Sequence, residues 1–88
     1  MSTKKVDSIT AEQCRAARAL VDMTQSELAS RSELGLSTVV DFEKGRRQVS
    51  ADAICAMRVA LESSGVIFIQ ENGAGAGVRL TKNGVRSK

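Results

Sequence analysis

The chain has 88 residues, of which 42% are hydrophobic and 26% charged, and its net charge is +3. This length fits one small domain with a modest core, for which association with a second copy is a common source of stability. With no histidine and two cysteines, Cys14 and Cys55, the sequence lacks the residues of a catalytic or metal site, so we expect no enzyme activity, metal or cofactor. It also lacks a signal peptide and an apolar run of about 18 residues, so we expect a cytoplasmic protein with no membrane partner.

The sequence predicts a mobile polar arm over residues 1–9, followed by two helices that each begin with a capping box. In the first box Thr10 precedes Gln13, and in the second Thr24 precedes Glu27. In this pattern two side chains at the start of a helix each bond the other residue's backbone amide. We expect the first helix to end near residue 22 and the second near residue 32.

Two further helices are predicted over residues 36–44 and after Ser50. In the third, Val39 and Phe42 recur at a helical spacing that faces a core, and Gly45 suits the left-handed conformation that ends many helices. The fourth carries an apolar stripe and is expected to end near residue 65. Its stripe consists of Ala53 or Ile54, Met57, Ala60 and Leu61.

After residue 65 the pattern changes to two short strands. Residues 66–70 are β-branched and aromatic, ENGAGAG is a turn signal, and residues 78–81 read as a second strand, so a hairpin is the simplest connection. Both faces of the first strand are apolar, whereas a half-solvated strand alternates with polar residues. We therefore expect a second copy of the chain to cover residues 66–82, with residues 83–88 forming a basic disordered tail. The expected dimer interface is Met57, Leu61, Val66, Ile67, Phe68 and Ile69.

Positive charge is concentrated after the third helix and near the C-terminus. Residues 10–43 hold six acidic residues and three arginines, and then Lys44, Arg46 and Arg47 follow within four residues. Such clusters favour an anionic partner, although solubility is the alternative explanation.

Residues 24–47 have the spacing of a helix-turn-helix, which is two short helices joined by three or four residues. In that arrangement the second helix can enter the major groove of DNA, and the first helix directs its N-terminal amides at a phosphate. We assign residues 10–65 to a DNA-binding domain on this basis.

The same segment resembles the Cro/C1-type (XRE) family, which includes phage repressors and the controller proteins of restriction–modification systems. The resemblance spans about residues 12–62. It rests on Arg18, Thr24-Gln25, Leu28-Ala29 and the ending Val39-x-x-Phe42-Glu43-x-Gly45-Arg46. It implies a mainly α, lambda-repressor-like bundle of four helices, here with a C-terminal β-hairpin. Three positions depart from the family pattern: Glu33 replaces a glycine of the turn, Gly35 replaces a capping serine or threonine, and Val49 replaces a proline.

The resemblance also implies roles for individual residues. Arg18 and Glu43 occupy the positions of a buried ion pair, and Thr24 and Gln25 those of a phosphate contact. We expect Gln25 to make it with its side chain and its backbone amide, with a surface capping role as the alternative. Leu36, Ser37 and Asp41 occupy the base-reading positions. Leu36 or Val40 suits thymine methyl groups, and Asp41 suits a cytosine amino group, unless it is a surface acid that repels phosphate.

We expect Thr38 to contact the DNA backbone, and Lys44, Arg46 and Arg47 to contact phosphates, with at least one reaching a base edge. A solvated cationic loop is the alternative for these three.

We therefore predict a sequence-specific transcriptional regulator that binds double-stranded DNA at a palindromic operator as a homodimer. Repression by occupying a promoter is the default mechanism, with activation through RNA polymerase and autoregulation as further options that the resemblance implies. One alternative is an antitoxin of the same fold that binds a toxin through its C-terminal segment. Another is a protein-binding module that has lost DNA binding.

Overall fold

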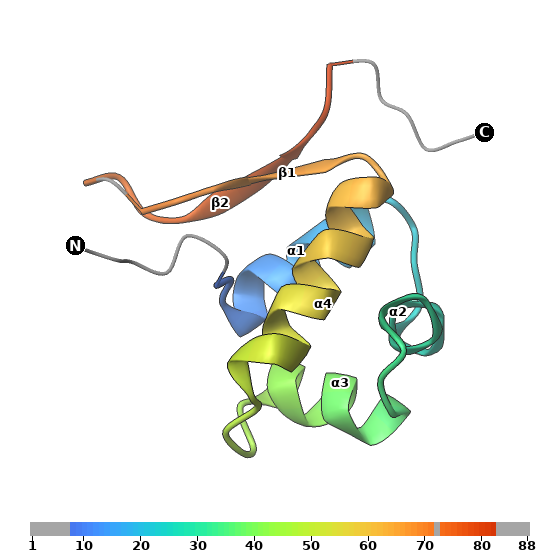
Figure 1. Cartoon of the computed structure of the whole chain (residues 1–88). Helices are drawn as coiled ribbons and strands as arrows, with labels where there is room; N and C mark the ends of the chain where they lie inside the picture. The colour runs from blue at the N-terminus through green and yellow to red at the C-terminus, as the bar shows by residue number, and fades with distance from the viewer. Residues whose placement is uncertain (1–7, 72, 83–88) are drawn as a thin grey trace.

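A computed structural model describes residues 8–71 and 73–82, which form four helices and a two-stranded antiparallel sheet. The elements are α1 (Ala11–Leu20), α2 (Gln25–Ser32), α3 (Leu36–Lys44), α4 (Ala51–Ser63), β1 (Val66–Ile69) and β2 (Gly77–Leu80). Figure 1 shows the hairpin along one side of the helical bundle and α3 on the side away from it. The predicted mainly α bundle with a C-terminal hairpin is confirmed.

Both predicted capping boxes are present. The Thr10 hydroxyl accepts a hydrogen bond from the Gln13 amide at 3.0 Å, and Gln13 Oε1 accepts one from the Thr10 amide at 2.9 Å. Thr24 and Glu27 make the same pair of bonds at 3.0 and 2.9 Å. Each box satisfies amides that a helix start otherwise leaves unpaired, which explains why α1 and α2 begin where the sequence predicts.

The helix ends fall close to the predicted positions. Gly45 adopts a φ of +68° and ends α3 in the left-handed conformation, as predicted. α1 and α4 end two residues earlier than expected, at Leu20 and Ser63. Asp22 and Gly65 follow these ends with φ values of +57° and +108°, which a right-handed helix does not accommodate.

The core lies between the four helices. Its least exposed apolar side chains come from every helix: Cys14, Ala17, Leu28, Val39, Met57 and Leu61, all at 0% exposure. The hairpin closes this core because Val66 is 2% exposed and Phe68 and Val78 pack against its edge. Burial of this continuous apolar surface is the main stabilising contribution to a domain of this size.

The predicted dimer interface needs a correction at three residues. Met57 and Leu61 are 0% exposed and Val66 is 2% exposed, so they have no surface left for a partner chain. They are covered within the protomer because α4 packs on α2 and on β1. Ile67 is 36% exposed, and Phe68 and Ile69 are half-buried.

The predicted N-terminal arm also needs a correction at its inner end. Ile9, which the arm was expected to include, is 5% exposed and belongs to the core cluster. An isoleucine placed directly before the cap of α1 is close enough to the core to be buried there. The rest of the arm, residues 1–7, and the predicted tail, residues 83–88, lie outside the described residues.

The hairpin has a defined register, and α1 is bonded to it. Val66 pairs with Leu80 and Phe68 with Val78, and the alternating Ile67 and Ile69 pair with Arg79 and Gly77. The strands are one residue off the predicted limits, since β1 ends at Ile69 and β2 begins at Gly77. The side-chain amide of Gln13 donates to the carbonyl oxygens of Ile69 at 3.2 Å and Gly77 at 2.9 Å. Gln13 thus caps α1 and also fixes the hairpin against it.

Candidate nucleic-acid interface

Helices α2 and α3 are joined by three residues, 33–35. Glu33 adopts the left-handed conformation, with φ of +58° and ψ of +42°, and the Leu34 amide donates to the Ala29 carbonyl at 2.9 Å. The turn therefore has a left-handed residue, for which glycine is best suited, and Glu33 adopts it at a cost of roughly 1–2 kcal/mol. Gly35 caps α3 without a side-chain hydrogen bond.

Helix α3 has a buried face and an exposed face. Val39 is 0% exposed and Glu43 is 2% exposed, while Phe42 is half-buried against the core. On the opposite face Ser37 is exposed, and Leu36, in the first turn of the helix, is 48% exposed. The remaining predicted contact residues of this helix, Thr38, Val40 and Asp41, are half-buried.

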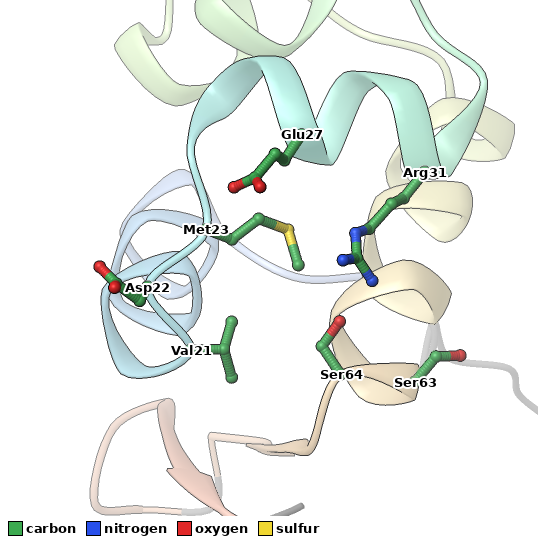
Figure 2. A pocket seen from close by; sticks show the side chains of 7 residues that line it. All are labelled: Val21, Asp22, Met23, Glu27, Arg31, Ser63 and Ser64. Carbon is green, nitrogen blue, oxygen red and sulfur yellow. The ribbon is translucent and has the colours of Figure 1, made fainter. Parts of the chain in front are cut away.

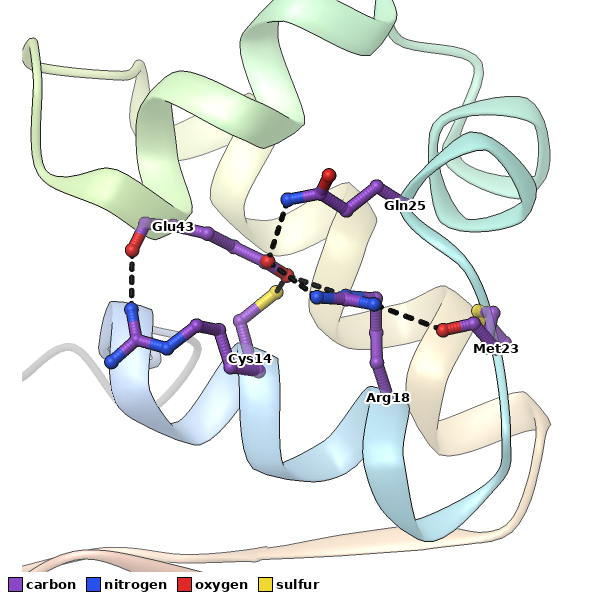
Figure 3. A network of polar contacts seen from close by, with 6 residues as sticks. Cys14, Arg18, Met23, Gln25 and Glu43 are labelled. Atoms are coloured by element: carbon purple, nitrogen blue, oxygen red, sulfur yellow. Dashed lines mark hydrogen bonds and ion pairs between the residues drawn. The ribbon is translucent and has the colours of Figure 1, made fainter.

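A carboxylate is buried at the end of α3, where Arg18 binds both of its oxygens (Figure 3). Arg18 Nε donates to Glu43 Oε2 and Arg18 Nη2 donates to Glu43 Oε1, each at 2.7 Å. The Glu43 side chain is 1% exposed and the Arg18 side chain 19%. Arg18 also donates to the Met23 carbonyl at 3.0 Å, so the pair links α1, the α1–α2 loop and α3.

Two further side chains donate to the same carboxylate. The Cys14 thiol donates to Glu43 Oε2 at 3.1 Å, and Gln25 Nε2 donates to Glu43 Oε1 at 3.0 Å. Arg15 also donates to the Glu43 backbone carbonyl. The first turn of α2 and the end of α3 are thereby fixed relative to α1. The sequence predicted neither the Cys14 nor the Gln25 contact.

The pKa values in this network reflect burial and hydrogen bonding. Burial alone would raise the pKa of the Glu43 carboxyl, but the hydrogen bonds from Arg18, Cys14 and Gln25 outweigh burial and lower that pKa below its usual value. The hydrogen bond to Glu43 raises the pKa of the Arg18 guanidinium. Burial, and then the hydrogen bond to Glu43, raise the pKa of the Cys14 thiol far above its usual value. Cys14 is therefore a neutral donor and not a nucleophile.

Gln25 lies at the predicted position, but its side chain points inward to Glu43 (Figure 3). The capping box already uses the backbone amides of Thr24 and Glu27, so in the described part of the chain the amides of Gln25 and Ser26 are those left without a helical partner at the start of α2. Thr24, the N-cap residue, is exposed and its hydroxyl is occupied by the capping box.

The cationic cluster after α3 folds back onto the exposed side of that helix. Arg47 Nε donates to Asp41 Oδ2 at 2.9 Å, and Arg47 Nη2 donates to Thr38 Oγ1 at 3.3 Å. Arg46 Nη1 lies 3.8 Å from Asp41 Oδ1. Lys44 is exposed, and the side chains of Arg46 and Arg47 are 60% and 50% exposed. Asp41 is thus a partner of two arginines, an arrangement that the sequence did not predict.

A pocket of about 280 Å³ lies away from this surface, between the end of α1, helix α2 and the end of α4 (Figure 2). Its lining is Val21, Asp22, Met23, Glu27, Arg31, Ser63 and Ser64. None of these residues belongs to α3 or to the cationic loop after it. The pocket is therefore separate from the surface that carries the predicted DNA contacts.

The helix-turn-helix family model matches residues 15–66, which is more than half of the chain and includes α2, the turn and α3. The chain belongs to the Cro/C1-type helix-turn-helix family. As a Cro/C1-type protein it is a DNA-binding regulator of the helix-turn-helix class. No curated protein matches the sequence. Over the residues that the structure describes, each helix is too short or too polar to cross a bilayer.

Proposed function

We propose that this Cro/C1-type protein is a sequence-specific transcriptional regulator that places α3 in the major groove of double-stranded DNA. The observation that carries this proposal is the division of α3 into two faces. Val39 and Glu43 fix one face to the domain, Ser37 is exposed on the opposite face, and Leu36 in the first turn is 48% exposed. A major groove about 12 Å wide admits one helix presented in this way.

The base contacts in this proposal come from the exposed side of α3. Leu36 or the half-buried Val40 packs on thymine methyl groups, and the Ser37 hydroxyl donates to or accepts from a base edge. The ion pairs of Asp41 with Arg46 and Arg47 make it a weaker candidate for direct contact with cytosine than the sequence alone suggests.

The phosphate contacts come from two places on either side of α3. At the start of α2, Gln25 contributes its backbone amide and the positive end of the helix dipole, and Thr24 contributes its exposed side chain, since the Thr24 amide is bonded to Glu27. After α3, the exposed cations Lys44 and Arg46 supply the second set, and in this proposal the half-buried Thr38 also contacts the DNA backbone. Contacts of this kind fix the orientation of a protein on DNA without reading its sequence.

A homodimer completes the proposal, because one short helix reads only a few base pairs. Two copies related by a two-fold axis place two α3 helices about 34 Å apart, one turn of DNA, and read a palindrome. The half-solvated strand β1 supports this arrangement, since Ile67 is 36% exposed and Ile69 lies on the same outer face.

Repression by blocking a promoter is the mechanism that we propose, with activation through RNA polymerase as the alternative. The apolar outer face of β1 also supports a second candidate, an antitoxin whose C-terminal segment binds a toxin. Co-expression with the products of neighbouring genes distinguishes the two. A stable complex with a small unrelated protein that covers β1 favours the antitoxin.

The test of the proposed function is selection of bound duplexes from a random pool by the purified full-length protein. We expect a palindromic consensus whose half-sites are centred about 10 base pairs apart. Protein that binds all duplexes equally at low salt would contradict sequence-specific regulation. A consensus with a single half-site would contradict the homodimer alone.

A further inference from the structure

The guanidinium of Arg47 is held against α3 along one of its two hydrogen-bonding edges. Nε donates to Asp41 Oδ2 at 2.9 Å and Nη2 to Thr38 Oγ1 at 3.3 Å. Asp41 and Thr38 are three residues apart, so both lie on one side of the helix. The loop residue Arg47 is thus placed on the helix that we propose for the major groove.

This arrangement leaves the terminal edge of the guanidinium unoccupied among the residues that the structure describes. A guanidinium has five N–H donors in a fixed plane, and Asp41 and Thr38 use two of them. The two Nη1 donors and the second Nη2 donor remain. Half of the Arg47 side chain is exposed, compared with 22% of the Asp41 side chain. The arginine therefore covers the acid and faces outward itself.

Guanine is the base whose major-groove edge fits those donors. It presents two adjacent acceptors, O6 and N7, and a planar fork of two N–H groups can bond both at once. A phosphate also accepts such a fork, but a phosphate contact gives no reason for the side chain to be fixed on the helix by an acid. An acid on a DNA-facing helix repels phosphates, so Asp41 is costly unless it serves a purpose there.

We propose that Arg47 is a specificity-determining residue that reads one guanine in each half-site, and that Asp41 and Thr38 are positioning residues that orient its guanidinium. The proposal rests on the proposed function, because it names a base recognised by the same surface. It replaces the cytosine contact expected for Asp41 with an indirect role. It also assigns base reading to a residue outside α3, which by itself has no arginine or asparagine in its middle.

The variant Asp41→Asn distinguishes a positioning role for Asp41 from simple repulsion of DNA by its charge. In Asp41→Asn the protein loses a negative charge, so affinity for DNA of random sequence rises. The same change replaces the carboxylate that orients Arg47 with a neutral amide oxygen, which is a weaker acceptor, so discrimination for guanine falls. If Asp41 acted only as a repelling surface charge, affinity for every duplex would rise together and the preferred sequence would stay the same.

The experiment selects bound duplexes from a random pool with the full-length wild-type protein, Arg47→Lys, Asp41→Asn and Thr38→Val. Affinities for the selected duplex and for its guanine-to-adenine and 7-deazaguanine forms are then measured at one salt concentration. We expect wild type to prefer guanine at one position per half-site by about 10- to 100-fold. Arg47→Lys keeps the charge but loses the fork, so this preference falls to a few-fold. Asp41→Asn and Thr38→Val show smaller losses at the same position.

Arg31→Lys is the matched control, since it makes the same arginine-to-lysine change at a residue that lines the pocket beside α2, away from the surface that carries the predicted DNA contacts. We expect its selected sequence to be that of wild type. An unchanged guanine preference in both Arg47→Lys and Asp41→Asn would overturn the inference and leave the proposed function standing. A wild-type protein that selects no sequence at all would overturn both. Melting temperatures within a few degrees of wild type show that the variants are folded.

Discussion

Arg18 on α1 binds both carboxylate oxygens of Glu43 at the end of α3, with two hydrogen bonds of 2.7 Å. The carboxylate is 1% exposed and therefore depends on its donors for the solvation that water would otherwise provide. Because Glu43 lies on the buried face of the helix that we propose for DNA, this pair helps set the orientation of the whole exposed face.

Replacing Arg18 by alanine is expected to destabilise the protein by about 3–5 kcal/mol, because it leaves a buried carboxylate without its charged partner. In a domain of this size such a loss lowers the melting temperature by more than about 10 °C. Thermal unfolding followed by circular dichroism measures it. The double variant Arg18→Met/Glu43→Leu is the control, and we expect it to lose less because no charge remains buried. A melting temperature unchanged by Arg18→Ala would show that the ion pair contributes nothing.

The Glu43 carboxyl is expected to make stability sensitive to acid. Its pKa in the folded protein lies below the ordinary value of 4.5. The carboxylate therefore contributes its full stabilisation above pH 4.5, and the contribution is lost as the pH falls through the lowered pKa. We expect the free energy of unfolding in urea to decrease below pH 4.5. The carboxyl carbon of Glu43, followed by NMR, should titrate with a midpoint below that value, and a midpoint above it would contradict the lowered pKa.

Replacing Glu33 by glycine is expected to stabilise the protein by about 1 kcal/mol. Glu33 has φ of +58°, a conformation that costs a residue with a Cβ roughly 1–2 kcal/mol and glycine almost nothing. The gain is reduced because glycine has a more flexible unfolded state. The control is Glu33→Ala, which removes the same carboxylate and keeps the Cβ, so we expect little or no gain. Equal stabilisation by both variants in urea denaturation would assign the effect to charge and not to the backbone.

Features set by neighbouring residues could be predicted from the sequence. The caps at Thr10, Thr24 and Ser50 and the end of α3 at Gly45 each involve groups within one helical turn, so their geometry follows from residue type and spacing. The two short strands followed from composition and from the glycine-rich turn between them. The expected division of α3 into an inner and an outer face followed from its helical period.

Hydrogen bonds between residues that are far apart in the sequence could not be predicted in the same way. Cys14 and Glu43 are 29 positions apart, and Gln13 and Ile69 are 56 apart. In the sequence Cys14 falls at the position of a small apolar side chain in a helix. Its thiol is a hydrogen-bond donor only because the fold brings the Glu43 carboxylate next to it. The prediction that Met57 and Leu61 belong to a dimer interface was wrong for a related reason. An apolar stripe has the same sequence pattern whether its own chain or a second copy covers it.

Alanine at Lys44, Arg46 and Arg47 together is expected to reduce the dependence of DNA binding on salt. The logarithm of the binding constant falls by about 0.9 per phosphate neutralised for each unit of log salt concentration. Since Lys44 and Arg46 are the proposed phosphate contacts, the triple variant should lower the magnitude of this slope by roughly 2 for each bound copy. Arg31→Ala is the control, because Arg31 lines the pocket between α2 and α4, away from the cationic loop. Equal slopes for wild type and the triple variant, from titrations at several salt concentrations, would show that these cations do not contact phosphates.

The dimer interface can be located by placing an acid on an exposed apolar position of β1 and, separately, on one of α4. Ile67→Asp changes the outer face of β1, where the isoleucine is 36% exposed, so the core stays intact. If the hairpin pairs two copies, two carboxylates are forced into one apolar contact and the dimer dissociates. Val59→Asp is the matched variant on α4, where the valine is 52% exposed. We expect sedimentation equilibrium to give a monomer for Ile67→Asp, with at least tenfold weaker binding to the selected palindrome, and a dimer for Val59→Asp. The reverse result would move the interface to α4, and tight binding by a monomeric wild-type protein would remove the need for an interface.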